Sequence, residues 1–520
     1  MPMEDTHTKS SFTELSHFSP ETETVRLLPL AFCHKHHVVV LDKQEDSFSC
    51  SITVGMAEPN SRNLLEMLAV FLKCKIIPVQ LNQYEVYQAL SKGYNSKLIS
   101  NDSNGHVIDL VEYDKQPASV NSNSAELLDH LLIDAVAKKA SDIHLECYMS
   151  DTDLRYRIDG ILQHQFTRIS LNKIGEVINR LKVLSDLDIT EHRVPQDGRF
   201  RCTFVDRELH STIDFRLNVL PGPTGEDAVI RILDAATVTL DINKLGLIPS
   251  LKDMLIMLAN NPEGLILVTG PTGSGKTTTL YSILNLLRNT GKKIVTAEDP
   301  VEYFVDKINQ KQVNSQVDMA TLSRAFLRHD PDIMLIGEIR DYETAETATK
   351  AASTGHLVLS TIHTPDAIGA IQRLRGLKLE NDEISNALLG ILSQRLLRKS
   401  CRSCCEKKSP SEHQKQILGE LLDGITNYQG IGCEECNNTG YRGRIGIFEL
   451  LLIDETLQNM IFQGISSHEV RNKARKAGFR LMLEDGLEKV KQAETSLDEI
   501  FRVIPYRQIV TTIAELSHKS

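Results

Sequence analysis

GLILVTGPTGSGKTTTLYSILNLLRNTG, residues 264–291, is the most specific stretch of this 520-residue chain. It opens with a short apolar run, 264–269, of the kind that forms a buried parallel strand. A pattern G-x-x-x-x-G-K-[ST] follows at once, formed by Gly270, Pro271, Thr272, Gly273, Ser274, Gly275, Lys276 and Thr277. Leucines and isoleucines at helical spacing over 280–287 then predict a helix that Gly291 can stop. Strand, glycine-rich turn and helix together predict a loop that cradles phosphates.

The chemistry of such a loop requires this order of residues. Glycines let backbone N–H groups turn inward, and the start of the helix adds partial positive charge. We expect Lys276 to reach the β- and γ-phosphates and the Thr277 hydroxyl to hold Mg²⁺. A chance glycine-rich turn is the alternative, but the strand before it and the helix after it argue against chance. The stretch therefore predicts a site for a nucleoside triphosphate with Mg²⁺.

A carboxylate that activates water is predicted at a second strand end. PDIMLIGEIRD, 331–341, reads as an apolar strand that ends in Gly337 and Glu338. Many P-loop ATPases carry Asp where this chain has Gly337, so Glu338 remains as the candidate base that orients or deprotonates water. Taken alone, such a carboxylate is as well explained as a solvated strand end.

Two further strand ends supply polar side chains. The segment IVTAED ends in Glu298 and Asp299, which we take as candidates for the metal side of the site. HLVLSTIH, 356–363, ends in His363, which is placed to donate to a γ-phosphate oxygen if its strand joins the same sheet. A lone histidine is more often structural. Several polar strand ends downstream of one phosphate loop nevertheless favour a shared active site.

A cysteine cluster predicts a metal site. Cys401-x-x-Cys404 and Cys433-x-x-Cys436 have the spacing of a tetrahedral structural zinc site, within a polar, glycine-bearing module over 398–440. Cys405 is a possible substitute ligand, and a redox pair or a nucleic-acid-binding zinc ribbon are the alternatives. The remaining cysteines are scattered and are expected to be small buried hydrophobes: Cys33, Cys50, Cys74, Cys147 and Cys202.

Composition narrows the function classes. Lys and Arg number 58 against 69 Asp and Glu, so the net charge of −11 argues against nucleic acid as the main ligand. Trp is absent and aromatic residues make up 5%, which disfavours a nucleic-acid-dependent ATPase, the alternative of another class. No apolar stretch is long enough to span a bilayer, and the N-terminus lacks the features of an export signal. We expect a cytoplasmic protein that meets a membrane only through partners.

Changes in pattern along the chain predict its domains. An α/β or α+β N-terminal domain without catalytic residues is interpreted as a docking module, and nearly all readable chemistry falls in the C-terminal half. The predicted segments are a mobile tail over 1–20, the N-terminal docking domain over 21–115, a linker over 116–124, a middle domain over 125–235, a linker over 236–246, and an α/β ATPase domain over 247–520 that contains the cysteine module and C-terminal helices.

Taken together, GPTGSGKTTT, TAEDPVEY, LRHDPDIMLIGEIRD and TGHLVLSTIHTPDA resemble the four boxes of the secretion-superfamily ATPases. Glycine before Glu338 is part of that family's pattern. The resemblance continues upstream in KKASDIHLECY, LRYRIDGIL and RVPQDGRF and downstream through the cysteine module, and covers roughly 125–510. Pro365 stands where the family usually has Asn, and Cys147 where it usually has Pro; we expect these departures to change local loop geometry and leave catalysis intact.

The resemblance implies a RecA-like core preceded by a PAS-like middle domain, assembled as a homo-hexamer, with ATP as the nucleotide. It also implies that Arg199 and Arg216 reach the nucleotide when the two domains close; from the strands alone, exposed edge charges would be the simpler reading. Within the superfamily the chain is similar to the ATPases of type II secretion, with those of type IV pilus assembly as the alternative. The implied partners are an inner-membrane platform protein and the cytoplasmic domain of an inner-membrane secretion protein, held by the N-terminal domain.

Overall fold

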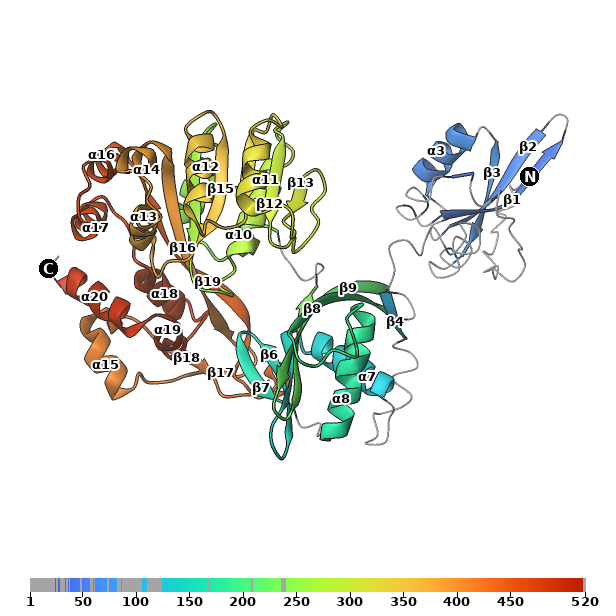
Figure 1. Cartoon of the computed structure of the whole chain (residues 1–520), viewed down its shortest axis with the longest axis horizontal. Coiled ribbons are helices and arrows are strands. Elements are labelled where there is room, and N and C mark those ends of the chain that lie inside the picture. The colour runs from blue at the N-terminus through green and yellow to red at the C-terminus, as the bar shows by residue number, and fades with distance from the viewer. Residues whose placement is uncertain are drawn as a thin grey trace, which may run out of the picture. The chain divides into compact units, whose positions relative to one another are not determined.

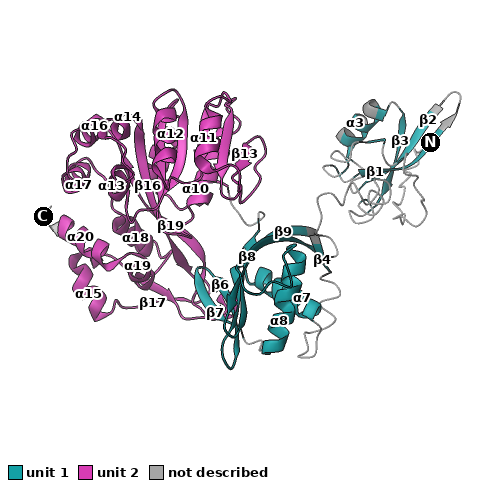
Figure 2. Cartoon of the chain, viewed as in Figure 1, with its two compact units in different colours: residues 1–234 teal, residues 235–520 magenta. Residues whose placement is uncertain are grey.

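The structure, a computed structural model, describes residues 124–165, 169–206, 209–234 and 240–517. It also describes shorter pieces before residue 124, chiefly 38–46, 49–56, 61–72, 74–81 and 105–109. The chain divides into two compact units, Met1–Asp234 and Ala235–Ser520 (Figure 2). The predicted tail over 1–20 lies outside the described residues, as does nearly all of the predicted linker over 116–124.

A small sheet forms the first described part of the first unit. Its strands are β1 (Val38–Asp46), β2 (Ser49–Met56) and β3 (Lys75–Gln80), with helix α3 (Arg62–Leu72) between β2 and β3. β2 pairs antiparallel with β1 and parallel with β3. The apolar runs of these strands pack with Leu64 and Leu68 of α3 into one core.

Two of the scattered cysteines form a disulfide, so the prediction that all five are simply buried hydrophobes is wrong for Cys50 and Cys74. The parallel register places Ser51 beside Lys75, so the residues that precede them in the chain are neighbours. Such a pairing across 24 residues follows from the strand register, which the cysteine spacing alone does not reveal. Cys33 and Cys202 are buried free thiols, as expected.

A seven-stranded sheet with two helices forms the second part of the first unit (Figure 1). Its order is β4-β8-β9-β10-β5-β6-β7, and α7 and α8 pack against it around one apolar core. On paired strands β8 and β9, Phe200 and Phe215 stack with their ring centroids 4.9 Å apart. The element bounds are β4 Gly105–Asp109, α7 Ser124–Ala137, β5 Ala140–Cys147, β6 Thr152–Ile158, β7 Ile161–His164, α8 Leu171–Leu184, β8 Gln196–Asp206, β9 Leu209–Gly222 and β10 Gly225–Leu233.

The second unit contains another seven-stranded sheet, of order β13-β12-β14-β15-β11-β16-β19. Its strands are parallel except β19, which pairs antiparallel with β16. The strands of this sheet are β11 Gly264–Thr269, β12 Ile294–Glu298, β13 Asn309–Gln312, β14 Ile333–Ile336, β15 Leu357–Ile362, β16 Leu388–Ser400 and β19 Tyr441–Leu452. β17 Cys405–Lys407 and β18 Tyr428–Gly430 form a separate two-stranded sheet. The α-helices are α9 Pro249–Ala259, α10 Lys276–Leu287, α11 Met319–Phe326, α12 Tyr342–Ala352, α13 Ala367–Gly376, α14 Asn381–Ala387, α15 Glu412–Leu418, α16 Glu455–Phe462, α17 Ser467–Lys476, α18 Met482–Lys491, α19 Leu497–Val503 and α20 Tyr506–Ser517.

Helices cover both faces of this sheet (Figure 1). Leu265 and Leu267 of β11 join a core with α12, α13 and α14, whereas Ile266 and Val268 join a second core with α9 and α10. Because successive side chains of a strand point to opposite faces, every residue of β11 is buried. This confirms the predicted buried parallel strand in front of the glycine loop.

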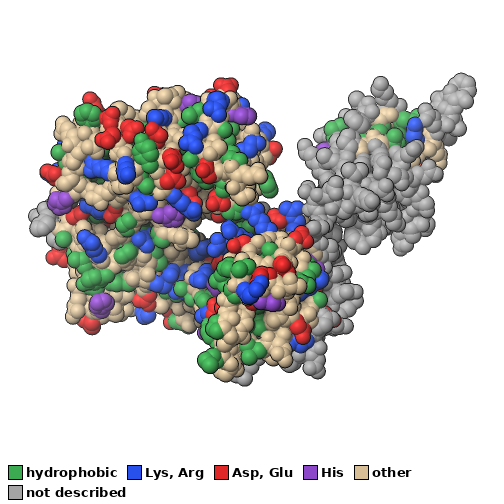
Figure 3. Space-filling view, viewed as in Figure 1, with side chains coloured by type: hydrophobic (Ala, Val, Ile, Leu, Met, Phe, Trp, Pro, Cys, Tyr) green, Lys and Arg blue, Asp and Glu red, His purple; other side chains and the backbone are tan. Residues whose placement is uncertain are grey.

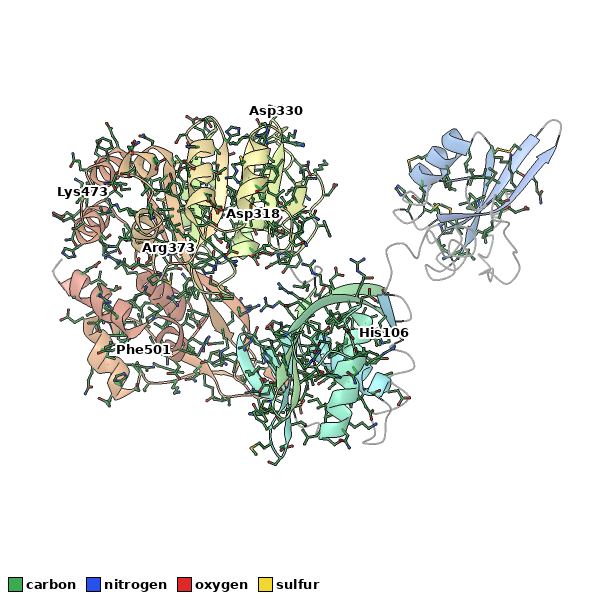
Figure 4. The ribbon with its side chains drawn as sticks, viewed as in Figure 1. His106, Asp318, Asp330, Arg373, Lys473 and Phe501 are labelled. Carbon is green, nitrogen blue, oxygen red and sulfur yellow. A yellow bond between two sulfur atoms is a disulfide. The ribbon has the colours of Figure 1, made fainter. Side chains whose placement is uncertain are left out.

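Aspartates cap the N-termini of helices α11 and α12. Asp341 accepts from the N–H of Thr344 at 2.8 Å at the start of α12. Asp318, labelled in Figure 4, accepts from the N–H of Thr321 at 2.7 Å at the start of α11. Parallel pairing brings the carboxyl ends of β11, β12, β14 and β15 to one edge of the sheet, where ligands of open α/β sheets bind. Among the described residues, helices fall short of the length and apolarity that a membrane span needs.

Candidate functional site

The glycine loop joins β11 to α10 at the carboxyl edge of the sheet. Gly270 and Gly275 have φ of 145° and 88°, values that L side chains rarely adopt. A Cβ on Gly270 would also lie 2.4 Å from the carbonyl oxygen of Gln394. Both positions therefore require glycine, and the loop keeps its backbone close to the sheet.

Lys276, the first residue of α10, folds its side chain over the loop. Its Nζ donates to the carbonyl oxygens of Gly270 at 3.0 Å and Pro271 at 3.1 Å. Burial lowers the pKa of Lys276, while the carboxylates of Glu338 and Glu302 act in the opposite direction. The ammonium group thus lies at the loop within the field of two acids, and the side chain of Thr277 beside it is half-buried.

Glu338 and His363 meet next to this lysine. Glu338 follows β14 and His363 follows β15, and these strands are hydrogen-bonded neighbours. The Glu338 carboxylate lies 2.5 Å from the Arg340 guanidinium and 3.6 Å from His363 Nε2. Burial and the charge of Lys276 lower the pKa of His363, against the opposing charge of Glu338, and so favour the neutral imidazole. The structure brings Lys276, Glu338 and His363 together.

Gly337 occupies the place where many P-loop ATPases carry aspartate. Its N–H donates to the carbonyl oxygen of Ala297 on β12 at 2.8 Å. A Cβ at Gly337 would lie 3.0 Å from the same oxygen and 3.4 Å from Met319 Cε. The close approach of β14 to β12 therefore leaves little space for a side chain here, which gives a physical reason for the glycine.

Glu298 is turned into the core. It is 4% exposed, and its carboxylate accepts from the hydroxyls of Tyr281 and Thr296 and, at 3.2 Å, from Gln310 Nε2. Burial first, and then the Glu298 charge, raises the pKa of Tyr281. The carboxylate thus ties together β12, α10 and β13, while the next residue, Asp299, is exposed.

Glu302 is a carboxylate that the sequence reasoning missed. Its negative charge, like that of Glu338, acts to raise the pKa of Lys276 against the effect of burial. The signal that could have revealed it is the second acidic residue of DPVEY, just beyond Pro300. Glu302 lies beyond the end of β12, so its carboxylate acts on Lys276 from the segment that follows the strand.

The loop after His363 is tied to the end of β11. Thr269 Oγ1 lies 2.7 Å from Thr364 Oγ1 and accepts from the Thr364 N–H at 2.9 Å. The carbonyl oxygen of Pro365 accepts a hydrogen bond from Gln508 Nε2 at 2.9 Å. Cys147, the other departure from the family pattern, has its Sγ 3.3 Å from the Glu226 carbonyl oxygen. Both residues thus make hydrogen bonds within the fold.

Arg199 and Arg216 lie in the first unit, directly opposite each other on antiparallel strands β8 and β9. Both are exposed, and Arg216 approaches Asp197 at 3.9 Å. Like charges directly opposite in such a pair are destabilising. Their neighbours Phe200 and Phe215 point the other way, into the core. The strands therefore hold two guanidinium groups together on one outward face.

The four predicted cysteine ligands converge in the second unit. The sulfur atoms of Cys401, Cys404, Cys433 and Cys436 all lie within 4.8 Å of one another. Contacts of 3.8 Å join Cys401 to Cys433 and Cys404 to Cys436, and 3.7 Å separates Cys433 from Cys436. Four thiolates at about 2.3 Å from a tetrahedral zinc ion would stand about 3.8 Å apart. The cluster therefore fits zinc.

Backbone amides support this cluster. The N–H of Gly432 points to Cys404 Sγ at 3.3 Å, and that of Gly440 to Cys436 Sγ at 3.2 Å. Such donors stabilise thiolate charge around a metal. Cys405 lies instead on strand β17, opposite Gly430 of β18, and does not belong to the group of four.

A glycine loop between a buried strand and a helix, with a carboxylate at a neighbouring strand end, defines the class of P-loop nucleoside triphosphatases. Within it, the chain belongs to the family described as type II/IV secretion system protein, which matches residues 119–502. The family described as the MshEN domain matches residues 9–99.

Relatives match nearly the whole chain. It is 37% identical to the type II secretion system ATPase E of Vibrio cholerae, over 94% of this chain and 99% of that protein. It is 36% identical to the type IV pilus assembly ATPase PilB of Myxococcus xanthus, over 94% of this chain and 87% of that protein. The solved structure of the Legionella pneumophila ATPase DotB, at 20% identity and a TM-score of 0.55, covers 79% of this chain and 100% of its own and shares the fold.

Proposed function

We propose that this chain is a secretion ATPase that hydrolyses ATP to drive type II protein secretion in a Gram-negative bacterium. The observation that carries the proposal is the convergence of Lys276, Glu338 and His363 beside a glycine loop at the carboxyl edge of the sheet. Membership of the type II/IV secretion system family, and relatives over almost the full length that bear type II secretion names, support the process.

Each residue of the site has a proposed role. The loop of 270–277 binds the triphosphate of ATP through its amides, and Lys276 neutralises phosphate charge. Thr277 would hold Mg²⁺, and the bound ion would supply neutralisation of phosphate charge. Glu338 orients the attacking water, and His363, as a neutral imidazole, donates to the γ-phosphate.

The acidic strand end of β12 is proposed to complete the metal side. Asp299 is exposed and acts through water, and Glu302 adds negative charge near Lys276. Glu298, although it belongs to the same strand end, acts through its bonds to Tyr281 and Thr296, which fix the direction in which the chain leaves the strand. Glu298 is thus proposed as a positioning residue.

Arg199 and Arg216 are proposed to offset phosphate charge during hydrolysis. Two guanidinium groups held opposite each other repel, and a bound anion relieves that repulsion. An arginine supplied from another domain or subunit is a recurrent device of P-loop enzymes. We propose that closing of the first unit on the RecA-like core delivers them, and that opening and closing performs mechanical work.

The assembly is proposed to be a homo-hexameric ring on the cytoplasmic side of the inner membrane. The MshEN match places a recognised domain family at the N-terminus, which supports docking on the cytoplasmic domain of a membrane partner and on the platform protein. Zinc is proposed to hold the module of 398–440 together, on the fit of its four sulfur atoms.

Type IV pilus assembly is the second candidate, favoured by the near-full-length match to a pilus assembly ATPase. Nucleic acid finds little support, because acidic and basic side chains both cover the face of the second unit drawn in Figure 3 and the net charge is −11. Deletion of the gene tests the proposal: loss of exported enzymes with pili retained supports it, and loss of pili with export retained contradicts it.

A second assay tests the biochemical part. ATPase activity of the full chain is measured with the cytoplasmic domain of the membrane partner and acidic lipid vesicles, and separately with single-stranded DNA. Stimulation by the first mixture alone is expected, and stimulation by DNA alone would assign the chain to nucleic-acid-dependent ATPases.

A further inference from the structure

Gln394 is a buried amide beside the glycine loop that the motifs do not explain. It lies on β16, the strand that pairs with β11 on the side away from β15. The register places Ser393 opposite Thr269, the last residue before the loop, so Gln394 stands level with the start of the loop. Its side chain is 2% exposed, and a buried carboxamide is stable only when its polar atoms are bonded.

Both ends of this carboxamide are committed to the loop and the helix after it. Nε2 donates to the carbonyl oxygen of Ser274 at 2.6 Å, and Oε1 accepts from the hydroxyl of Thr279 at 2.8 Å. Ser274 is in the middle of the loop, and Thr279 is in the first turn of α10, where it is 1% exposed. The Gln394 side chain of β16 is thus hydrogen-bonded both to the glycine loop and to helix α10.

The bond to Ser274 fixes the orientation of a peptide plane. The cis peptide found among the described residues is Asp299–Pro300, so the Ser274–Gly275 bond is trans. In a planar trans peptide the C=O and the following N–H point in opposite directions. Because the Ser274 carbonyl points at Gln394, the Gly275 N–H points away from β16. Gly275 itself has a positive φ of 88°.

We propose that Gln394 is a positioning residue of the phosphate-binding loop, which holds the Ser274–Gly275 peptide so that the Gly275 N–H faces the phosphates of ATP. The proposal rests on the assignment of 270–277 to the triphosphate. Without the Nε2 donor, the Ser274 carbonyl would lose its buried partner, and the peptide would turn to find another. The Gly275 amide would turn with it, because the two groups share one rigid plane.

The expected loss is in affinity. An amide that bonds the phosphates in the ground state and in the transition state contributes uniform binding, so its displacement raises KM and leaves kcat nearly unchanged. A general loss of folding would instead lower the fraction of active protein and reduce the apparent kcat. The KM-against-kcat split therefore separates a positioning role from a merely structural one.

The test uses the full chain and Mg-ATP as the probe, with binding measured by calorimetry and turnover by phosphate release. Gln394→Met keeps the length of the side chain and removes the donor, and Gln394→Leu is a second variant. Both should weaken Mg-ATP binding about tenfold, which corresponds to about 1.4 kcal/mol, with kcat within about threefold of wild type. Thr279→Val keeps the donor to Ser274 and should change binding less than threefold.

Gln414→Leu is the matched control, since Gln414 is a 6% exposed glutamine of the same unit that bonds Asp498 and Ser411 away from the loop. It should leave Mg-ATP affinity unchanged. Wild-type affinity in Gln394→Met, a fall in kcat at unchanged KM, or equal weakening in Gln414→Leu would each overturn the inference while the ATP site stands. A wild-type chain that binds no Mg-ATP would overturn the proposed function and this inference together.

Discussion

The glycine loop and the cysteine module are both candidate ligand sites of the second unit, and they are built in opposite ways. The loop directly follows β11, whose six residues are all buried between two apolar cores. Between 401 and 440 the apolar side chains that reach full burial are those of Cys401, Leu418 and Cys436. Burial supports the first site before any ligand arrives. In the second, 417–425 packs on an apolar core, whereas the stretches 401–407 and 428–440 that carry the cysteines bury little besides sulfur atoms.

This contrast predicts how each site responds to loss of its ligand. A loop framed by packed strands keeps its shape when the nucleotide leaves, because the free energy of folding comes from the core. A module held by four thiolates takes its folding free energy from the metal. Loss of the nucleotide should therefore leave the glycine loop folded but inactive, whereas loss of zinc should unfold the cysteine module.

The largest expected effect tests the module. Cys433→Ser combined with Cys436→Ser should abolish zinc binding and expose the cysteine-bearing stretches 401–407 and 428–440 to protease, since the remaining thiolates cannot close a tetrahedral site. Structural zinc contributes on the order of 10 kcal/mol. Zinc content by atomic absorption and limited proteolysis are the measurements. Cys405→Ser is the matched control and should keep one zinc per chain. A protease-resistant, zinc-free double variant would break the comparison.

The next effect concerns the chemistry of the loop region. Glu338→Gln should lower kcat by about a thousandfold, because an amide cannot take a proton from water or orient it as a carboxylate does. Phosphate release at saturating ATP measures this, and the melting temperature should hold because the frame is unchanged. Glu343→Gln, on the exposed start of α12, should remain close to wild type. If Glu338→Gln hydrolysed ATP normally, another group would have to activate water.

A smaller effect is expected at the paired arginines. Arg199→Ala and Arg216→Ala should each lower kcat about a hundredfold while ATP still binds, because the guanidinium charge is needed most as phosphate charge develops. Each variant should also relieve the like-charge pair and leave the melting temperature unchanged or slightly higher. Arg193→Ala, whose side chain is 87% exposed and paired with Glu191, serves as control. Turnover near wild type in both main variants would remove these arginines from the mechanism.

The smallest expected effect concerns the sheet that carries the glycine loop, and it is a change in the pH dependence of stability. Glu449 on β19 is fully buried, and burial, with the charge of Asp366, raises its pKa to about 7, although the N–H groups of Ala367 and Met482 oppose this. Between its ordinary pKa and about 7 the folded protein holds a proton that the unfolded chain has released, so stability falls as pH rises through this window.

Glu449→Gln should flatten that slope. The melting temperature of the variant, measured from pH 5 to pH 8, should gain a few degrees on wild type as pH rises. Parallel melting curves for the two proteins across this range would show that Glu449 ionises in its ordinary range.

The sequence predicted the strand ends at which the site residues stand, because apolar runs closed by Gly337, Asp299 and His363 stop where β14, β12 and β15 stop. It also predicted the four cysteines that converge, since their spacing is local. It could not assign a face to Glu298. That carboxylate shares its side of β12 with Thr296, and its burial follows from the Tyr281 side chain, which belongs to α10 and lies outside the sequence motif of this strand.

Long-range neighbours account for the rest. Gln394 is 120 residues from Ser274, and Cys50 meets Cys74 only through the register of β2 and β3. Neither pair has a pattern within its own stretch of sequence. Gly337 was visible as a departure from many P-loop enzymes, but its reason, the nearby carbonyl oxygen of Ala297, belongs to the next strand of the sheet.

Binding of Mg-ATP to the wild-type chain and to Lys276→Ala, measured side by side by calorimetry, tests the central claim most directly. If the loop that follows β11 receives the triphosphate, the wild type binds one ATP per chain and the variant, which still folds, loses most of that affinity. Equal affinity in both proteins, or binding by neither, would contradict it.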